Sequence, residues 1–146
     1  MRRIAAIALT ALLAGCGNHP DIQVTNLPSE CVGVPTRMLK ALKRAPAPVR
    51  VGGVPISHCF IKDQSGTDVQ ILGTTLIAAA QQLGDRAGSD KAMALQLGYL
   101  VGAARRGARR NGVTDELVRR IEAETGGVGG HRQAYQRGLR AGLATG

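Results

Sequence analysis

Apolar residues in the last two thirds of the chain recur every three or four positions, which is the spacing of one face of an α-helix. The pattern starts at Thr67 and continues almost to the end of the sequence. The predicted helices cover residues 67–84, 90–111, 115–124 and 131–143. The second helix is the longest, and its first half is apolar around much of its circumference, which places it at the centre of a bundle.

Residues that cap or end helices support these boundaries. Gly84 is expected to stop the first helix and Asn111-Gly112 the second, because both residue types adopt the left-handed conformation that often follows a helix. Ser89 and Thr114 are the expected N-caps of the second and third helices, since a hydroxyl oxygen accepts a hydrogen bond from a free backbone N–H. The run Gly126-Gly127-Val128-Gly129-Gly130 predicts a flexible linker before the last helix.

Two glycine pairs stand out within the helices. Gly98 and Gly102 are four positions apart in the second helix, and Gly138 and Gly142 repeat the spacing in the last one. Such pairs let another backbone approach closely. In a membrane they would favour dimerisation, but arginines follow the first pair, so we expect close packing of these two helices within one chain.

The region from residue 16 to residue 66 has a different pattern. All six prolines of the chain lie between positions 20 and 55, so long regular elements are not expected there. One short helix is predicted over Thr36–Arg44. A small β-hairpin is predicted over Val49–Ile56, because Gly52-Gly53 supplies the positive φ that a two-residue turn needs. Phe60-Ile61 is expected to extend its second strand.

Composition indicates one small globular domain. The chain has 146 residues, of which 44% are hydrophobic and 20% charged, and this balance is typical of a folded protein. We expect a mainly α fold: a small bundle of four or five helices with a turn-rich N-terminal region that holds the hairpin. Residues 16–66 and 67–146 would form one domain. The formal net charge of +9 predicts an anionic partner.

The first sixteen residues resemble the signal peptide and lipobox of bacterial lipoproteins. Arg2 and Arg3 give a positively charged start, residues 4–13 are apolar apart from Thr10, and Leu13-Ala14-Gly15-Cys16 has the lipobox pattern. The apolar run is too short to cross a membrane, which takes about 20 residues. The resemblance implies cleavage after residue 15 and attachment of a diacylglycerol to the sulfur of Cys16.

This resemblance also sets the compartment. Acyl chains such as palmitate on Cys16 would hold the mature protein on a membrane of the cell envelope. Lipoproteins that stay in the inner membrane of Gram-negative bacteria carry Asp after the cysteine, whereas this chain has Gly17. In a Gram-negative organism we therefore expect the outer membrane, facing the periplasm. Phospholipid head groups or acidic envelope proteins are then the expected anionic partners, and nucleic acid is not.

With Cys16 lipidated, Cys31 and Cys59 remain as a pair in an oxidising compartment. A disulfide between them is the natural prediction. The alternative is a metal site that uses both cysteines with His58 and either His19 or His131. No two of these residues have a spacing typical of a zinc ligand pair, so no metal and no cofactor are expected.

Arginines at the ends of two successive predicted helices are the densest chemical feature of the mature chain. We expect them to form one cationic corner that contacts lipid phosphate or an acidic protein. In the alternative interpretation, these arginines form a solvated face and pair with acidic residues of the next helix. The six residues are Arg105, Arg106, Arg109, Arg110, Arg119 and Arg120.

Catalytic patterns are weak. Ser57 and His58 are neighbours, but adjacent residues do not thereby form a nucleophile and its base, and the motifs G-x-S-x-G, S-x-x-K and H-E-x-x-H are absent from the sequence. The sequence therefore favours a lipid-anchored binding or assembly component without turnover, and no catalytic residue is assigned. A cationic lipoprotein that perturbs membranes is the second hypothesis, and an envelope hydrolase is the third.

Overall fold

The structure is a computed structural model that describes residues 26–109 and 115–146. Within these residues the elements are η1 (Ser29–Cys31), α1 (Pro35–Leu42), β1 (Arg50–Val51), β2 (Val54–Pro55), η2 (Ile56–Cys59), α2 (Gly66–Ala87), α3 (Lys91–Ala108), α4 (Asp115–Ala123), η3 (Glu124–Gly127), η4 (Gly129–His131) and α5 (Arg132–Thr145). The expected mainly α fold with a short N-terminal hairpin is confirmed.

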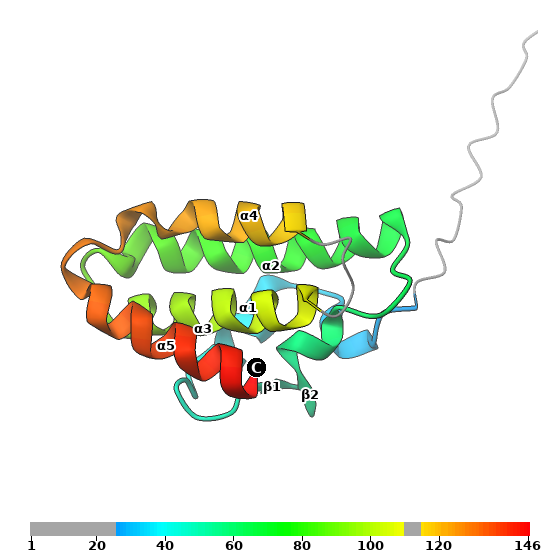
Figure 1. Cartoon of the computed structure of the whole chain (residues 1–146), viewed down its shortest axis with the longest axis horizontal. Helices are drawn as coiled ribbons and strands as arrows, with labels where there is room; N and C mark the ends of the chain where they lie inside the picture. The colour runs from blue at the N-terminus through cyan, green and yellow to red at the C-terminus, as the bar shows by residue number, and fades with distance from the viewer. Residues whose placement is uncertain (1–25, 110–114) are drawn as a thin grey trace, which may run out of the picture.

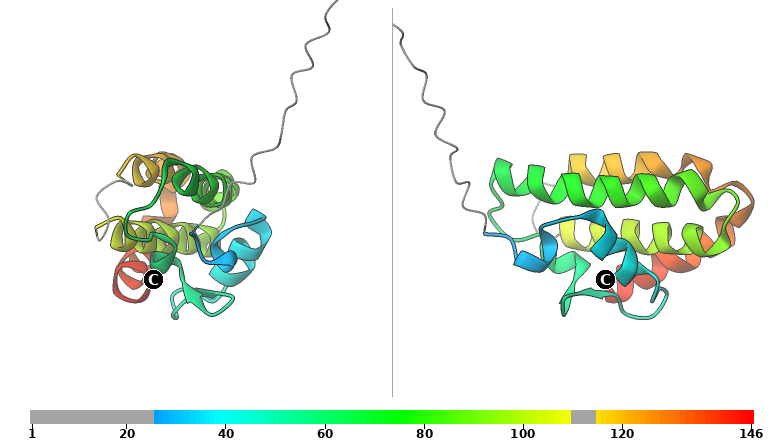
Figure 2. Two further views of the ribbon diagram at one scale, coloured as in Figure 1. Left: turned by 90° about the vertical axis from the view of Figure 1, so that its right-hand side faces the viewer. Right: turned by 180° about the vertical axis from the view of Figure 1, so that it is seen from behind.

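The four longer helices form two layers. α2 and α4 lie side by side in one layer, and α3 and α5 lie in the other (Figure 1). The connections from α2 to α3 and from α4 to α5 are at the same end of the molecule. α1 packs against α2 and α3, and the hairpin lies beside α1 (Figure 2). Leucines of α2 and α3 fill the centre, and Leu72, Leu76, Leu97 and Leu100 are fully buried.

The two glycine pairs bring α3 and α5 into backbone contact, as the sequence predicts. A Cβ atom on Gly98 would overlap the carbonyl oxygen of Tyr135, and one on Gly138 would overlap that of Leu95. Gly102 faces α5 in the same way, one turn further along. No side chain larger than hydrogen fits at these positions while the helices keep their separation.

α2 begins with a reciprocal capping box. Ser65 Oγ accepts a hydrogen bond from the backbone N–H of Asp68, and the Asp68 carboxylate accepts one from the backbone N–H of Ser65. The predicted end of this helix at Gly84 is wrong, since α2 continues to Ala87. Gly84 serves close packing instead: the backbone carbonyl oxygen of Glu124 lies 2.5 Å from where its Cβ would be.

Two other predicted boundaries need correction. The N-cap of α3 is Asp90 and not Ser89, because the Asp90 carboxylate accepts hydrogen bonds from the N–H groups of Ala92 and Met93. A carboxylate also interacts more favourably than a hydroxyl with the positive end of the helix dipole. The expected stop at Asn111-Gly112 and the expected cap at Thr114 lie outside the described residues.

The hairpin has the predicted two-residue turn. β1 and β2 pair antiparallel, with Val51 opposite Val54, and Gly52 and Gly53 have φ values of 56° and 94°. The expected extension over Phe60-Ile61 is wrong, because the chain turns into η2 directly after Pro55.

The glycine-rich segment before α5 also differs from the predicted flexible linker. It forms the 3-10 turns η3 and η4, and the side chain of Val128 between them is buried. Gly127 lies against Gly88, so this segment packs on the end of α2. Burial of the Val128 side chain anchors this glycine-rich segment to the rest of the fold.

Candidate functional site

The described chain begins beside the N-terminus of α2. The backbone N–H of Asn26 donates a hydrogen bond to Asp68 Oδ1 at 3.2 Å, and the Asp68 side chain is fully buried. Asp68 therefore caps α2 and also holds the segment that leads back to the predicted lipidation site. Cys16 and the predicted signal peptide lie outside the described residues. The signal for this role of Asp68 was the spacing Ser65-x-x-Asp68, which our sequence analysis did not use.

Replacing Asp68 with alanine is expected to lower the free energy of unfolding by about 2 kcal/mol, because the capping box and the bond to Asn26 are both lost. Denaturant unfolding of the two proteins measures this difference. The exposed Asp85 has no hydrogen bond or ion pair with a described residue, so Asp85→Ala is the control and should change stability little. Equal effects of both variants would show that Asp68 has no special role.

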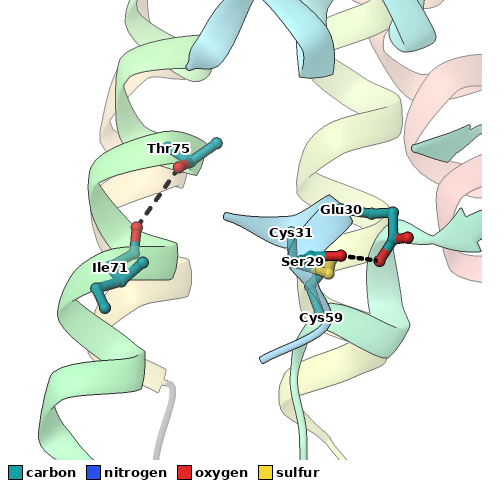
Figure 3. The surroundings of a disulfide bond; sticks show 6 residues. All are labelled: Ser29, Glu30, Cys31, Cys59, Ile71 and Thr75. Carbon is teal, nitrogen blue, oxygen red and sulfur yellow. Dashed lines mark hydrogen bonds between the residues drawn. A yellow bond between two sulfur atoms is a disulfide. The ribbon is translucent and has the colours of Figure 1, made fainter. Parts of the chain in front are cut away.

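The disulfide between Cys31 and Cys59 is confirmed. It joins η1 to the end of η2, and both cysteines are fully buried (Figure 3). Thr75 of α2 donates a hydrogen bond from its hydroxyl to the backbone carbonyl of Gly33 at 2.9 Å. The disulfide thus connects two segments of the N-terminal region, and the Thr75 side chain connects this region to α2. Because these cysteines are bonded to each other, the alternative of a metal site that uses them is wrong.

The predicted arginine corner does not form one free cationic surface, because most of its arginines have partners of their own. Arg105 Nε donates to Glu122 Oε1 at 2.6 Å and connects α3 with α4. Arg106 donates to the carbonyl oxygens of Leu143 and Ala144 in the last turn of α5, where a positive charge also favours the helix dipole. Arg109 is exposed and unpaired among the described residues, and Arg110 lies outside them.

The two remaining arginines pair within their own helix. Arg119 and Arg120 both donate hydrogen bonds to the carboxylate of Glu116. The hydrogen bond from Arg120 and the charge of Arg119 hold the pKa of Glu116 below its ordinary value. Likewise the hydrogen bond to Glu122 raises the pKa of Arg105. Four of these arginines therefore stabilise helix contacts or pair with acids.

A double-mutant cycle on Arg105 and Glu122 should give a coupling of about 1 kcal/mol in the free energy of unfolding, at the upper end of values for exposed pairs. The pair is only partly exposed, with side-chain exposures of 39% and 30%, and it joins two helices. Arg105→Met, Glu122→Gln and the double variant supply the measurement. The same cycle on Arg120 and Glu116, which are more exposed, should give a smaller coupling; a larger one would contradict this ranking.

Ser57 and His58 do not form a catalytic pair. Ser57 is fully buried and its hydroxyl donates a hydrogen bond to the carbonyl oxygen of Gly146, while His58 is exposed. His131 is the last residue of η4 and directly precedes α5. Among the described residues, no group of three or more His, Cys, Asp or Glu side chains is placed to hold a metal ion.

Basic side chains without a partner lie on two other helices. Lys40 and Lys43 on the α1 side are exposed, and so are Arg132, Arg137 and Arg140 on α5; none has a hydrogen bond or ion pair with a described residue. At 100° per residue, these three arginines occupy one outward arc of α5, opposite its glycines. The sequence pattern assigned no role to these three arginines. The signal that distinguishes them is the lack of a nearby acidic residue.

An open groove of about 450 Å³ lies between α1 and the adjoining ends of α2 and α3. Its floor contains the apolar side chains of Leu39, Leu83 and Met93, and the uncharged polar residues Thr36, Gln82 and Gln96 complete the lining between the cations. Its rim carries Lys40 and Lys43 on one side and Arg86 on the other. No carboxylate is among the described residues that line it. A second groove of about 510 Å³ between α2 and α4 has both Glu116 and Arg120 on its rim, so its charge is mixed.

No helix in the described parts of the chain is both long enough and apolar enough to cross a membrane. No protein-family model, no curated protein and no solved structure matches this chain.

Proposed function

We propose that this protein is a lipid-anchored binding or assembly component of the bacterial cell envelope that acts by surface contact without turnover. The proposal combines the lipobox-like segment ending at Cys16 with a domain whose described part begins ten positions later, at Asn26. Acyl chains on Cys16 would supply the membrane affinity, so the folded domain is left to bind a partner. In a Gram-negative cell the anchor would lie in the outer membrane and the domain in the periplasm.

The distribution of charge on the surface supports the binding role. The arginines of the predicted corner are largely engaged by acids and carbonyl oxygens, whereas basic residues of α1 and α5 are exposed with no partner among the described residues. Unpaired like charges contribute nothing to the fold and repel one another. Their presence on two outer faces supports a role in contacting an anionic partner.

Comparing the wild type with Cys16→Ala tests the proposal. Native membranes of cells that express each protein are crosslinked and fractionated, and the proteins that co-purify are identified. We expect the wild type in the membrane fraction with a defined partner and the variant in the soluble fraction. A soluble wild type would disprove the anchor, and a membrane-bound wild type without any crosslinked protein would disprove the binding role.

A second function, direct contact with anionic lipid, is favoured by the arginine arc of α5. Each basic residue near an anionic membrane surface contributes about 1 kcal/mol to binding, and Arg132, Arg137 and Arg140 face outward together. In the Cys16→Ala background, replacing all three with glutamine should abolish binding to phosphatidylglycerol vesicles at low salt. If the unlipidated protein does not bind such vesicles at all, this second function is excluded.

A further inference from the structure

The groove between α1, α2 and α3 combines an apolar floor with a positively charged rim. Leu83 is almost fully buried, and Leu39 and Met93 are partly exposed above it, so apolar surface is open to a ligand. Three cations surround this surface. Lys40 and Lys43 have no partner among the described residues, and Arg86 makes only a long ion pair of 3.8 Å with Asp90.

We propose that this groove binds an amphipathic helix of a partner protein, with an apolar stripe on the floor and carboxylates on both sides. Helices bind in grooves by placing apolar residues at helical spacing into them. Here the cations stand on both sides of the floor, on α1 and on α2, so acidic residues flanking an apolar stripe would meet opposite charge on each side. Charged residues at such flanking positions also set the partner choice of paired helices.

The position of the groove favours a protein over the anchoring membrane. This step rests on the proposed function, because it takes Cys16 as the anchor. The chain joins the domain at Asn26, which is bonded to Asp68 at the start of α2. Arg86 is near the other end of this helix, about 27 Å further along at 1.5 Å per residue. The groove therefore opens at the end of α2 that is remote from the tether.

Charge also disfavours the chain's own N-terminal segment as the occupant. With cleavage after residue 15, the mature segment keeps residues 16–25, whose only carboxylate side chain is that of Asp21. One carboxylate can pair with only one of the three cations on the rim. The complementary ligand must bring several carboxylates, and it must come from another protein.

The test uses the lipidated full-length protein in phosphatidylcholine nanodiscs and a fluorescent synthetic peptide. The peptide has about 20 residues, enough to form a helix, with a leucine stripe flanked by glutamates. A second peptide has the same composition in scrambled order. Fluorescence anisotropy should show binding of the first peptide and at least about tenfold weaker binding of the second, since only the first presents a stripe.

Matched variants locate the binding site. Lys40→Ser/Lys43→Ser removes two charges from the rim, and Arg132→Ser/Arg137→Ser removes two charges from α5, outside the groove. Because all four side chains are exposed, both variants should fold, which circular dichroism checks. We expect the rim variant to bind the peptide about tenfold more weakly. The α5 variant should bind the peptide like the wild type, because the role proposed above for its arginines is contact with anionic lipid, which phosphatidylcholine nanodiscs lack, and they lie outside the groove.

Three outcomes would overturn the proposal. Equal weakening by both variants would mean unspecific attraction between charges, and no change in either would mean that the groove is not used. If the rim variant loses binding to phosphatidylglycerol vesicles while the peptide does not bind the wild type, the occupant is lipid and not a helix. Cell fractionation of Cys16→Ala tests the lipid anchor separately. The anchor and the binding of a helix in the groove can therefore be disproved independently of each other.

Discussion

Replacing Gly138 with alanine is expected to destabilise the fold by about 3 kcal/mol or more, the upper part of the range for overpacked interiors. The added methyl group would overlap the backbone carbonyl oxygen of Leu95 on α3. Backbone atoms cannot rotate away as a flexible side chain can, so α3 and α5 must move apart along their whole contact. Denaturant unfolding, with the midpoint and the slope both fitted, measures this loss.

Gly73→Ala is the matched control, because Gly73 is also buried inside a helix. The nearest atom to its Cβ position is a methyl carbon of Leu117 at 3.4 Å, an ordinary contact distance. Alanine favours a helix over glycine by up to about 1 kcal/mol, so this variant should be as stable as the wild type or more stable. If Gly73→Ala and Gly138→Ala lose equal stability, close approach of the helix backbones is not the reason.

The contact between α3 and α5 uses both glycine pairs. All four glycines of the two pairs pack backbone against backbone between α3 and α5 of one chain. They are therefore occupied within the fold and are not exposed for pairing with another helix. The spacing predicted a close helix contact, because glycines four apart lie on one helix face. The arginines that follow the first pair placed this contact within one chain.

Other features could not be predicted from local patterns. Gly84 resembles a helix stop by residue type, yet the helix continues because the fold uses its missing side chain to admit the Glu124 backbone. Asp90 and Ser89 are both good caps, and only the path of the chain decides between them. In each case a tertiary contact or a backbone direction overrode a correct local preference.

The arginines of the candidate site also could not be interpreted from local sequence patterns. The density of arginines along the sequence marked Arg105 and Arg106, but density does not reveal which carboxylates and carbonyl oxygens lie opposite. Glu122 is 17 positions from Arg105, and Leu143 is 37 positions from Arg106. Unpaired charges can be recognised only when the long-range partners are known, and in the described residues they include the basic side chains of α1 and α5.

Removing the disulfide with Cys31→Ala/Cys59→Ala is expected to lower the free energy of unfolding by roughly 3.5 kcal/mol. The bond closes a loop with a sequence separation of 28, and the estimate follows from the loop entropy that it removes from the unfolded chain. The Cys16→Ala background keeps a third thiol from exchanging with this pair. Chemical denaturation of the oxidised protein, the reduced protein and the double variant gives the three stabilities.

α1 lies entirely inside the loop that this disulfide closes, and it contributes Leu39 and Lys40 to the groove. Breaking the bond should therefore loosen the groove as well as the fold, and reduction should weaken binding of the acidic peptide. Alanine at both positions should reproduce the effect of reduction on stability. If the reduced and oxidised proteins unfold at the same denaturant concentration, the loop adds no constraint. The groove would then depend only on the contacts of α1 with α2 and α3.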